Sequence, residues 1–166
     1  HAGTITVRSE VGIGTTFNFL GPLANPVQPA AQAIGCADPR MAPVMAGVFA
    51  RRGVDAWVFR GDDGLDELTT TTTSTLWRVA DGEVAVSTVD PATHGLPRAE
   101  AAALRGGDAA HNAEVIRRLV DGETGPVRDA VVLNAGAALA VYDGGAGSVD
   151  ELLAAGITRA QAALDE

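Results

Sequence analysis

The sequence predicts an α/β fold in which a partly parallel β-sheet is flanked by helices. Two apolar stretches, residues 31–37 and 54–59, enclose one amphipathic helical stretch with short joints, which is the pattern of a βαβ unit with parallel strands. Aromatic residues make up only 4% of a chain that is 46% hydrophobic, so close packing of Ala, Val and Leu faces must fill the core. The 166 residues fit one compact unit, and we expect a single α/β domain over residues 1–166.

The first part of the chain predicts a strand, a turn and a loop. Residues 4–8 alternate polar and apolar side chains, as a half-buried strand does, and Gly12 and Gly14 then interrupt regular structure. Residues 21–26 contain two prolines, which lack a donor and bias the preceding residue to extended geometry. We therefore expect a shaped loop there, without helix or strand.

The helix of the predicted βαβ unit has recognisable ends. Asp38 and Pro39 suit the N-cap and the first helical position, and residues 51–53, Arg-Arg-Gly, are typical of a helix C-terminus. Helical spacing predicts an inner face made of Met41, Val44, Met45, Val48 and Phe49. Ligands in such sheets gather beyond the carboxyl ends of the parallel strands.

A hairpin and three helices are predicted for the remainder. Residues 76–79 and 83–89 are strand-like and are joined through Asp81 and Gly82, a turn signal that places a hairpin at one edge of the sheet. Asp108 suits the N-cap of a helix that ends near Gly122. Its predicted inner face consists of Val115, Ile116, Leu119 and Val120. Residues 126–142 predict a helix buried between layers, and the last helix has a narrower apolar stripe formed by Leu153, Ile157, Ala160 and Leu164.

Charge and composition exclude several classes of function. The net charge of −9 and the absence of a basic run argue against a nucleic-acid partner. The single cysteine, Cys36, excludes an internal disulfide, and its apolar neighbours predict a buried thiol. No apolar stretch is long enough for a bilayer and no secretory signal is recognisable at the start, so we expect a cytoplasmic protein without a membrane partner.

The strongest chemical signal is an acidic stretch directly after the second predicted parallel strand. Four carboxylates, those of Asp62, Asp63, Asp66 and Glu67, occur within six positions around a glycine. Such carboxylates favour a hard cation such as Mg²⁺, which often bridges to substrate phosphates. The alternative is a solvated acidic loop. The five threonines that follow, residues 69–73, offer hydroxyls to a phosphate, although a loop or a β-prone edge is the favoured interpretation.

Several ordered motifs resemble one enzyme family. Residues 16–26 (TFNFLGPLANP), 61–69 (GDDGLDELT), 105–112 (RGGDAAHN) and 125–135 (GPVRDAVVLNA) are similar, in this order, to the anthranilate phosphoribosyltransferases of tryptophan biosynthesis. The resemblance covers roughly residues 7 to 165. It implies the C-terminal α/β domain of a phosphoribosyltransferase, in a truncated form, with an architecture related to that of the pyrimidine nucleoside phosphorylases.

The resemblance also implies a reaction and site residues. The family transfers the phosphoribosyl group of phosphoribosyl pyrophosphate to anthranilate with the help of Mg²⁺, which Asp66 and Glu67 match as ligands. Arg8 matches the arginine that faces the anthranilate carboxylate, and Gly21 matches a position that lines the anthranilate site. Asn134, in an otherwise apolar helix, is expected to bond internally instead of touching substrate.

Parts of the family pattern do not appear in this sequence. The family's glycine-rich loop for phosphoribosyl pyrophosphate, its Lys-His-Gly-Asn-type segment and most of its dimerisation helices precede the matching region. We therefore expect an incomplete enzyme that is inactive alone, and a monomer or loose aggregate although the family forms homodimers. Residues 1–17 also resemble the last glycine box of histidine-kinase ATP-binding domains. The alternatives are thus a nucleotide-binding module built on Gly12 and Gly14, or a non-catalytic interaction domain.

Overall fold

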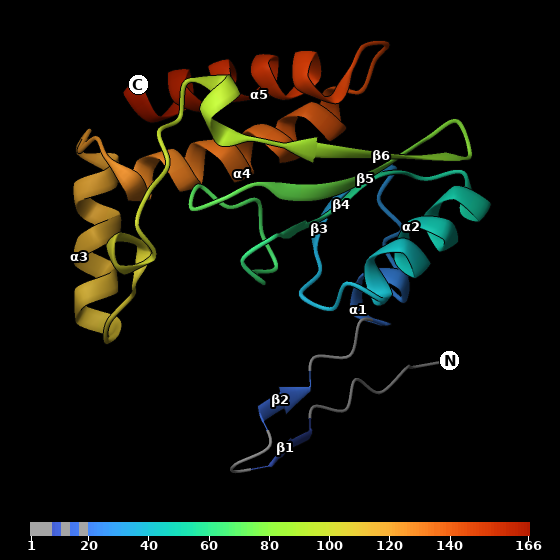
Figure 1. Cartoon of the computed structure of the whole chain (residues 1–166), viewed down its shortest axis with the longest axis horizontal. Coiled ribbons are helices and arrows are strands. Elements are labelled where there is room, and N and C mark those ends of the chain that lie inside the picture. The colour runs from blue at the N-terminus through green and yellow to red at the C-terminus, as the bar shows by residue number, and fades with distance from the viewer. Residues whose placement is uncertain (1–7, 11–13, 17–19) are drawn as a thin grey trace.

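The computed structural model describes residues 8–10, 14–16 and 20–166 and contains a four-stranded mixed sheet (Figure 1). The strands are β3 (Ala31–Gly35), β4 (Asp55–Gly61), β5 (Ser74–Ala80) and β6 (Glu83–Val89), in that spatial order. β3 and β4 are parallel, whereas β4, β5 and β6 pair antiparallel. The predicted α/β class with a partly parallel sheet is confirmed.

Helix α2 (Met41–Arg52) completes the predicted βαβ unit and covers one face of the sheet. Its buried residues are Ala42, Met45, Ala46 and Phe49, so the predicted inner face is right for Met45 and Phe49. It is wrong for Val44, which is 51% exposed. The N-cap is Arg40 and not Asp38, because Pro39 and Arg40 form a turn in which the Asp38 carboxylate accepts the Arg40 backbone N–H. Gly53 ends the helix in the left-handed conformation, as predicted.

The hairpin at the sheet edge follows the prediction. Asp81 and Gly82 form a two-residue turn with φ values of 52° and 77°, the positive values that a type I′ turn requires. β6 pairs only with β5 among the described strands, so the hairpin does extend one edge of the sheet.

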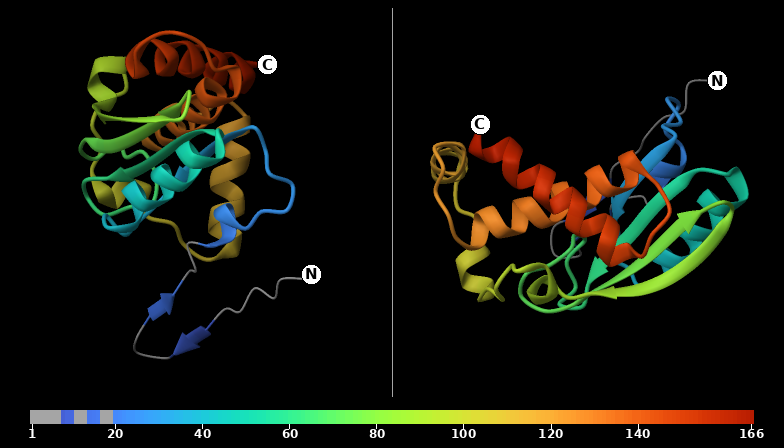
Figure 2. Two further views of the ribbon diagram at one scale, coloured as in Figure 1. Left: turned by 90° about the vertical axis from the view of Figure 1, so that its right-hand side faces the viewer. Right: turned by 90° about the horizontal axis from the view of Figure 1, so that it is seen from above.

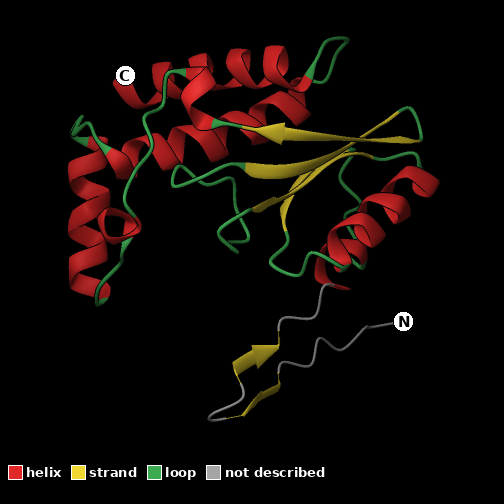
Figure 3. Cartoon of the chain, viewed as in Figure 1, coloured by secondary structure: helices red, strands yellow, loops and turns green. Residues whose placement is uncertain are grey.

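Two long helices cover the other face of the sheet (Figures 2 and 3). α4 (Pro126–Asp143) and α5 (Val149–Asp165) pack on each other and on the side of the sheet opposite α2. A side chain at Gly156 would come within 2.1 Å of the Gly136 carbonyl oxygen, so the helices approach through glycine. The predicted burial of α4 is confirmed for six of its residues, among them Val132 and Leu133, but Val131 and Tyr142 are 38% and 77% exposed. The stripe of Leu153, Ile157 and Ala160 on α5 is confirmed.

Two expectations about the remaining elements are wrong. Residues 20–23 form a short helix, α1 (Leu20–Leu23), where a loop was expected. Pro22 is tolerated because it lies in the first turn, where a backbone N–H has no helical acceptor. In α3 (Ala109–Val120), Asp108 is the N-cap as predicted, but the helix has no buried residue, and Ile116 and Val120 are 60% and 63% exposed. The helical spacing of apolar residues predicts an apolar face on α3, but it does not indicate whether another element covers that face.

Short segments complete the chain. Two 3₁₀ turns, η1 (Pro91–His94) and η2 (Ala101–Leu104), connect β6 to α3. β1 (Arg8–Glu10) and β2 (Gly14–Thr16) pair antiparallel, so Gly14 starts a strand where an interruption was expected. Most of the strand predicted at residues 4–8, and Gly12, lie outside the described residues. In the described part of the chain, no helix has the length and apolar character needed to cross a membrane.

Candidate functional site

The acidic loop, residues 62–67, lies beyond the carboxyl end of β4, beside the carboxyl end of β3. Two tight backbone bonds shape it: the Gly61 N–H donates to the Leu65 carbonyl at 2.9 Å, and the Gly64 N–H donates to the Gly61 carbonyl at 2.9 Å. Gly64 has a φ of 104°, which favours glycine. Because β4 ends at Gly61 and pairs parallel with β3, the prediction that the acidic stretch follows a parallel strand is confirmed.

The first two carboxylates of the loop are held by threonine hydroxyls. Asp63 Oδ2 accepts hydrogen bonds from Thr69 Oγ1 at 2.7 Å and Thr71 Oγ1 at 2.5 Å. Asp62 accepts from Thr73 Oγ1 at 2.5 Å and Thr75 Oγ1 at 3.0 Å. The threonines thus fold back over this half of the loop and satisfy its carboxylates with hydrogen bonds, a role that sequence reasoning missed.

These hydroxyls change the acidity of Asp63. Partial burial by itself raises the pKa of this carboxyl, but the hydrogen bonds from Thr71 and Thr69 outweigh that effect, and the pKa lies below its ordinary value. Hydroxyl donors favour the charged form. Asp63 is therefore an ionised structural anchor of the loop.

The second pair of carboxylates has a different environment. Asp66 and Glu67 are exposed, and neither carboxylate has a hydrogen bond or ion-pair partner within residues 20–166. Burial of part of the Glu67 carboxyl raises its pKa, and the negative charges of Asp66 and Asp63 raise it further. A bound cation would relieve this repulsion, and carboxylate oxygens are the donors that Mg²⁺ prefers. The two residues therefore fit a magnesium site in chemistry and in exposure.

The backbone around this pair is held from two sides. A Cβ atom at Gly35, the last residue of β3, would lie 1.5 Å from the Asp66 carbonyl oxygen, so only glycine permits this approach. On the other side, the Asn134 side chain accepts the Leu68 N–H at 2.9 Å and donates to the Leu68 carbonyl at 2.8 Å. The expectation that Asn134 bonds internally is confirmed. The sequence carried no signal for its partner, which lies 66 residues away.

The same groups do not form a closed metal cage. No cluster of three or more His, Cys, Asp or Glu side chains arranged for a metal occurs in the described part of the chain.

Cys36 is 1% exposed and its thiol lies 3.4 Å from the Asp38 carbonyl oxygen. Burial raises the pKa of this thiol, which agrees with the predicted inert, buried cysteine.

The structure does not test the predicted anthranilate residues, Arg8 and Gly21. Arg8 opens β1, and its side chain lies outside what the structure describes. Gly21 lies in α1, and no atom of the described residues lies within 4 Å of its Cβ position. The Leu23 carbonyl, at the end of α1, accepts a 2.5 Å hydrogen bond from Arg52 in the last turn of α2. This last turn lies near the amino end of β4, whereas the acidic loop follows its carboxyl end. The roles of Arg8 and Gly21 stay predictions.

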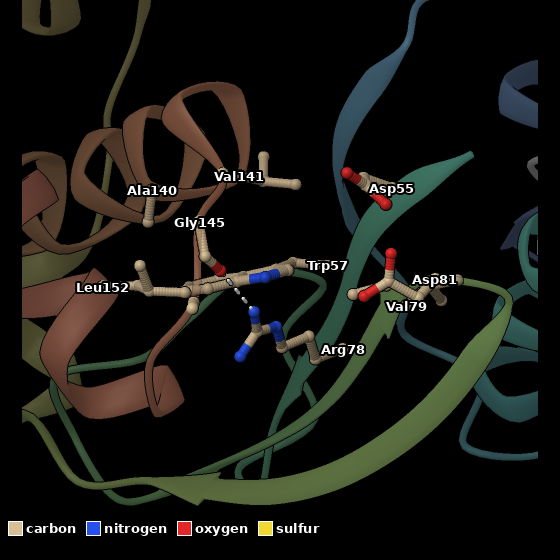
Figure 4. Close-up of a pocket in the computed structure, with 12 residues that line it drawn as sticks. Asp55, Trp57, Arg78, Val79, Asp81, Ala140, Val141, Gly145 and Leu152 are labelled. Carbon is tan, nitrogen blue, oxygen red and sulfur yellow. Dashed lines mark hydrogen bonds between the residues drawn. The ribbon is translucent and has the colours of Figure 1, made fainter. Parts of the chain in front are cut away.

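A cavity of about 310 Å³ lies at the opposite end of β4 (Figure 4). It is lined by Asp55 and Trp57 from β4, Arg78 from β5 and the start of the α4–α5 connection. Arg78 donates to the carbonyl oxygens of Gly147 at 2.5 Å and Gly145 at 3.0 Å. Arg78 therefore connects the sheet to the helical layer. The acidic loop is the stronger candidate site, because it lies at the carboxyl end of the parallel strands, where ligands bind in such sheets.

Comparisons with known proteins agree on one family. The family model described as "Glycosyl transferase family, a/b domain" matches residues 2–166, which include most of the segment that resembles a histidine-kinase box. Anthranilate phosphoribosyltransferases of Nocardioides sp. and Thermobifida fusca are 75% and 60% identical over 158 residues, or 95% of this chain. These matches cover 46% and 45% of the relatives, so the chain spans about half the length of the curated relatives that it matches.

Solved structures show the same fold. Anthranilate phosphoribosyltransferase (TrpD) from Thermus thermophilus is 34% identical with a TM-score of 0.77, covering 93% of this chain and 44% of that one. The enzyme from Saccharomyces cerevisiae in complex with PRPP and Mg is 23% identical with a TM-score of 0.77 over the same shares of each chain. With the family model matched from residue 2 to residue 166, the chain belongs to the glycosyl transferase family, of which it carries the α/β domain.

Proposed function

We propose that this chain supplies the α/β part of an anthranilate phosphoribosyltransferase, in which Asp66 and Glu67 hold Mg²⁺ for the transfer of phosphoribosyl from phosphoribosyl pyrophosphate to anthranilate. One observation carries the proposal. In a chain 75% identical over 158 residues to such an enzyme, these two carboxylates are the members of the acidic loop that threonines do not engage. They also lie where ligands of parallel sheets bind.

The chemistry expected of this site is positioning and charge neutralisation. When bound, Mg²⁺ offsets the negative charge that develops on the departing pyrophosphate. Asp66 and Glu67 supply hard oxygen donors for the ion, while Asp62 and Asp63 keep the loop in shape through their threonines. No nucleophilic side chain is needed, because the amine of anthranilate attacks the ribosyl carbon, pyrophosphate leaves with the bonding electron pair, and the nitrogen releases a proton to water.

Arg8 and Gly21 are proposed for the acceptor side. A guanidinium offers two parallel donors, which suit the carboxylate of anthranilate. Gly21 has no atom of the described residues within 4 Å of its Cβ position, so a planar ring can approach the backbone there. Assignment of both residues depends on the family resemblance. In an active chimera of this chain with the rest of a family enzyme, replacing Arg8 by Gln should raise the KM for anthranilate more than the KM for phosphoribosyl pyrophosphate.

Turnover by the chain alone is not expected, since the basic and glycine-rich elements that hold a pyrophosphate in the family are not found in its sequence. We propose a single α/β domain that acts in the cytoplasm together with the rest of such an enzyme.

A chimera tests the proposal directly. This chain replaces the 158 matching residues in the Nocardioides enzyme, and anthranilate consumption is followed by its fluorescence with phosphoribosyl pyrophosphate and Mg²⁺. We expect turnover in the chimera and none after Asp66→Asn with Glu67→Gln. A folded, inactive chimera beside an active parent enzyme would refute the proposal.

One observation favours a second function, an interaction domain. The apolar side chains of Ile116 and Val120 on α3 are exposed, and such a face favours association. It predicts that sedimentation shows weak, concentration-dependent self-association that does not respond to Mg²⁺. A chain that stays monomeric at every concentration would contradict this second function.

A further inference from the structure

We infer that Asn134 is a positioning residue for the metal-binding pair: its side-chain amide sets the direction in which Glu67, and with it Asp66, faces the cation. This inference rests on the proposed role of Asp66 and Glu67 as Mg²⁺ ligands. It assigns to α4, an element otherwise devoted to the core, a part in the site.

The contact is a two-point clamp. Asn134 Oδ1 accepts the Leu68 N–H at 2.9 Å and Nδ2 donates to the Leu68 carbonyl at 2.8 Å, while Nδ2 also donates to the Ala130 carbonyl at 3.0 Å. The amide therefore replaces a neighbouring β-strand for Leu68, which lies outside the sheet. Only a carboxamide offers an acceptor and a donor in this geometry.

The clamp acts on Glu67 through the peptide bond. The Leu68 N–H belongs to the planar unit that begins at the carbonyl carbon of Glu67, so holding that N–H restricts the ψ angle of Glu67. Leu68 has no exposed surface, and the next N–H, that of Thr69, donates to Ser74 Oγ at 3.0 Å. Glu67 is thus the last residue before a rigidly held segment.

Gly35 restricts the same pair at a second point, the backbone of Asp66. The Asp66 carbonyl oxygen occupies the space where a Cβ of residue 35 would be. Asp66 and Glu67 consequently sit between β3 and the Asn134 clamp. Loss of the clamp frees one side of this arrangement, and the two carboxylates then sample more orientations.

The position of Asn134 agrees with a positioning role. It lies in a helix with six buried residues, among them its neighbours Val132 and Leu133. A partly buried polar side chain is tolerated there because its amide oxygen and nitrogen both have partners, whereas an apolar replacement would leave the Leu68 N–H and carbonyl without these hydrogen bonds.

Asn112 provides a matched control. Its amide makes the same kind of two-point contact, accepting the Gly107 N–H at 2.8 Å and donating to the Gly107 carbonyl at 3.1 Å. That clamp joins α3 to the loop before it and is remote in the chain from the acidic loop. The substitution Asn→Asp removes the donor at either site with little change in shape and adds one negative charge, which by itself would favour a nearby cation.

The test is a titration of the chain with Mn²⁺, in which the paramagnetic signal of the free ion measures how much is bound. The titration compares the unmodified protein with three variants: Asn134→Asp, Asn112→Asp and Asp66→Asn/Glu67→Gln. Thermal unfolding of each variant is recorded in parallel. We expect the double variant to lose binding, Asn134→Asp to weaken it about tenfold or more, and Asn112→Asp to leave it within about twofold.

The outcomes separate the two ideas. If Asn134→Asp lowers only the melting temperature and binds Mn²⁺ as the unmodified chain does, the positioning role is overturned and the metal pair stands. If the unmodified chain binds no Mn²⁺, or the double variant binds as well as it, the proposed metal pair fails and the positioning role fails with it.

A measurement on the unmodified chain covers the case in which Asn134→Asp does not fold. Because coupling is reciprocal, Mg²⁺ bound by Asp66 and Glu67 should slow hydrogen exchange of the Leu68 amide. The Gly107 amide, held by Asn112, should not respond. Equal exchange of the Leu68 amide with and without saturating Mg²⁺ would overturn the inference.

Discussion

The two halves of the acidic loop have similar sequences and opposite environments. Asp62 and Asp63 each accept two threonine hydroxyls, whereas Asp66 and Glu67 have no hydrogen-bond partner for their carboxylates among the described residues. The pKa of Asp63 is lowered and that of Glu67 is raised. The acidic residues in a sequence therefore show how many carboxylates could bind a cation. Which of them are available depends on the threonines that fold back over the loop and bond to Asp62 and Asp63.

The largest expected effect separates the two halves by catalysis. In the chimera with the Nocardioides enzyme, Asp66→Asn with Glu67→Gln should lower kcat/KM at least about a hundredfold, because the metal loses its protein ligands. Asp62→Asn, which changes a carboxylate held by Thr73 and Thr75, should cost less than about tenfold. Comparable losses from both would show that the halves share one role.

Gly35→Ala should produce the next largest effect. The added Cβ would overlap the Asp66 carbonyl oxygen, a contact of 1.5 Å with backbone, so we expect a loss of about 2–3 kcal/mol in the free energy of unfolding. Urea denaturation measures this change. The control is Gly47→Ala in α2, where no atom of the described chain lies within 4 Å of the added Cβ, and we expect it to be neutral or stabilising by up to about 1 kcal/mol. Equal effects would mean that the loop does not rest on β3.

The two halves should also respond to pH with opposite sign. The folded-state pKa of Asp63 lies below its ordinary 3.8, so its stabilisation is present above that value and is lost as pH falls through the folded pKa. Asp63→Asn should therefore destabilise the chain at pH 7, by about 0.5–1 kcal/mol, with the difference disappearing in acid.

Glu67 should show the reverse in the absence of metal. Its folded-state pKa lies above its ordinary 4.5, so its favourable contribution is present below that value and is lost as pH rises through the folded pKa. Glu67→Gln should then stabilise the metal-free chain slightly at pH 7 and have no effect in acid. Thermal unfolding of Asp63→Asn and Glu67→Gln between pH 3 and pH 8 checks both expectations. Changes of the same sign in the two melting temperatures at pH 7 would contradict the expected difference between the two halves of the loop.

The smallest expected effect comes from two neighbouring threonines. Thr71 Oγ1 donates to Asp63, whereas the buried Thr70 Oγ1 has no hydrogen-bond partner in the described structure. Thr71→Val should destabilise by about 0.5 kcal/mol, while Thr70→Val should be neutral or stabilising. Urea denaturation of the pair decides the matter, and a larger loss at Thr70 would point to a partner for its hydroxyl.

Much of the fold could be predicted because the signals are local. The parallel strands around α2, the turn at Asp81 and Gly82, and the N-cap at Asp108 depend on residues within a few positions of one another. The errors concern partners: Val44 and Ile116 are apolar and correctly spaced, yet no described element covers them. The short helix α1 was missed because a proline in a first turn loses no hydrogen bond.

The candidate site was predictable in its chemistry and only partly in its construction. Carboxylates after a parallel strand indicate a cation site, and the resemblance selected Asp66 and Glu67. The threonine bonds to Asp62 and Asp63, the approach of Asp66 to Gly35 and the clamp of Asn134 join residues up to 66 positions apart. No periodicity or composition encodes such a distance.

The sequence by itself determined the α/β class, the order of the elements and the family, because hydrophobic periodicity, turn residues and motif spacing are properties of neighbouring positions. Only the tertiary structure decided which carboxylates remain available, which glycine admits the backbone of Asp66 and which asparagine holds Leu68. The physical reason is that hydrogen bonds and steric exclusion act within a few ångströms, and the fold alone brings distant segments to that range.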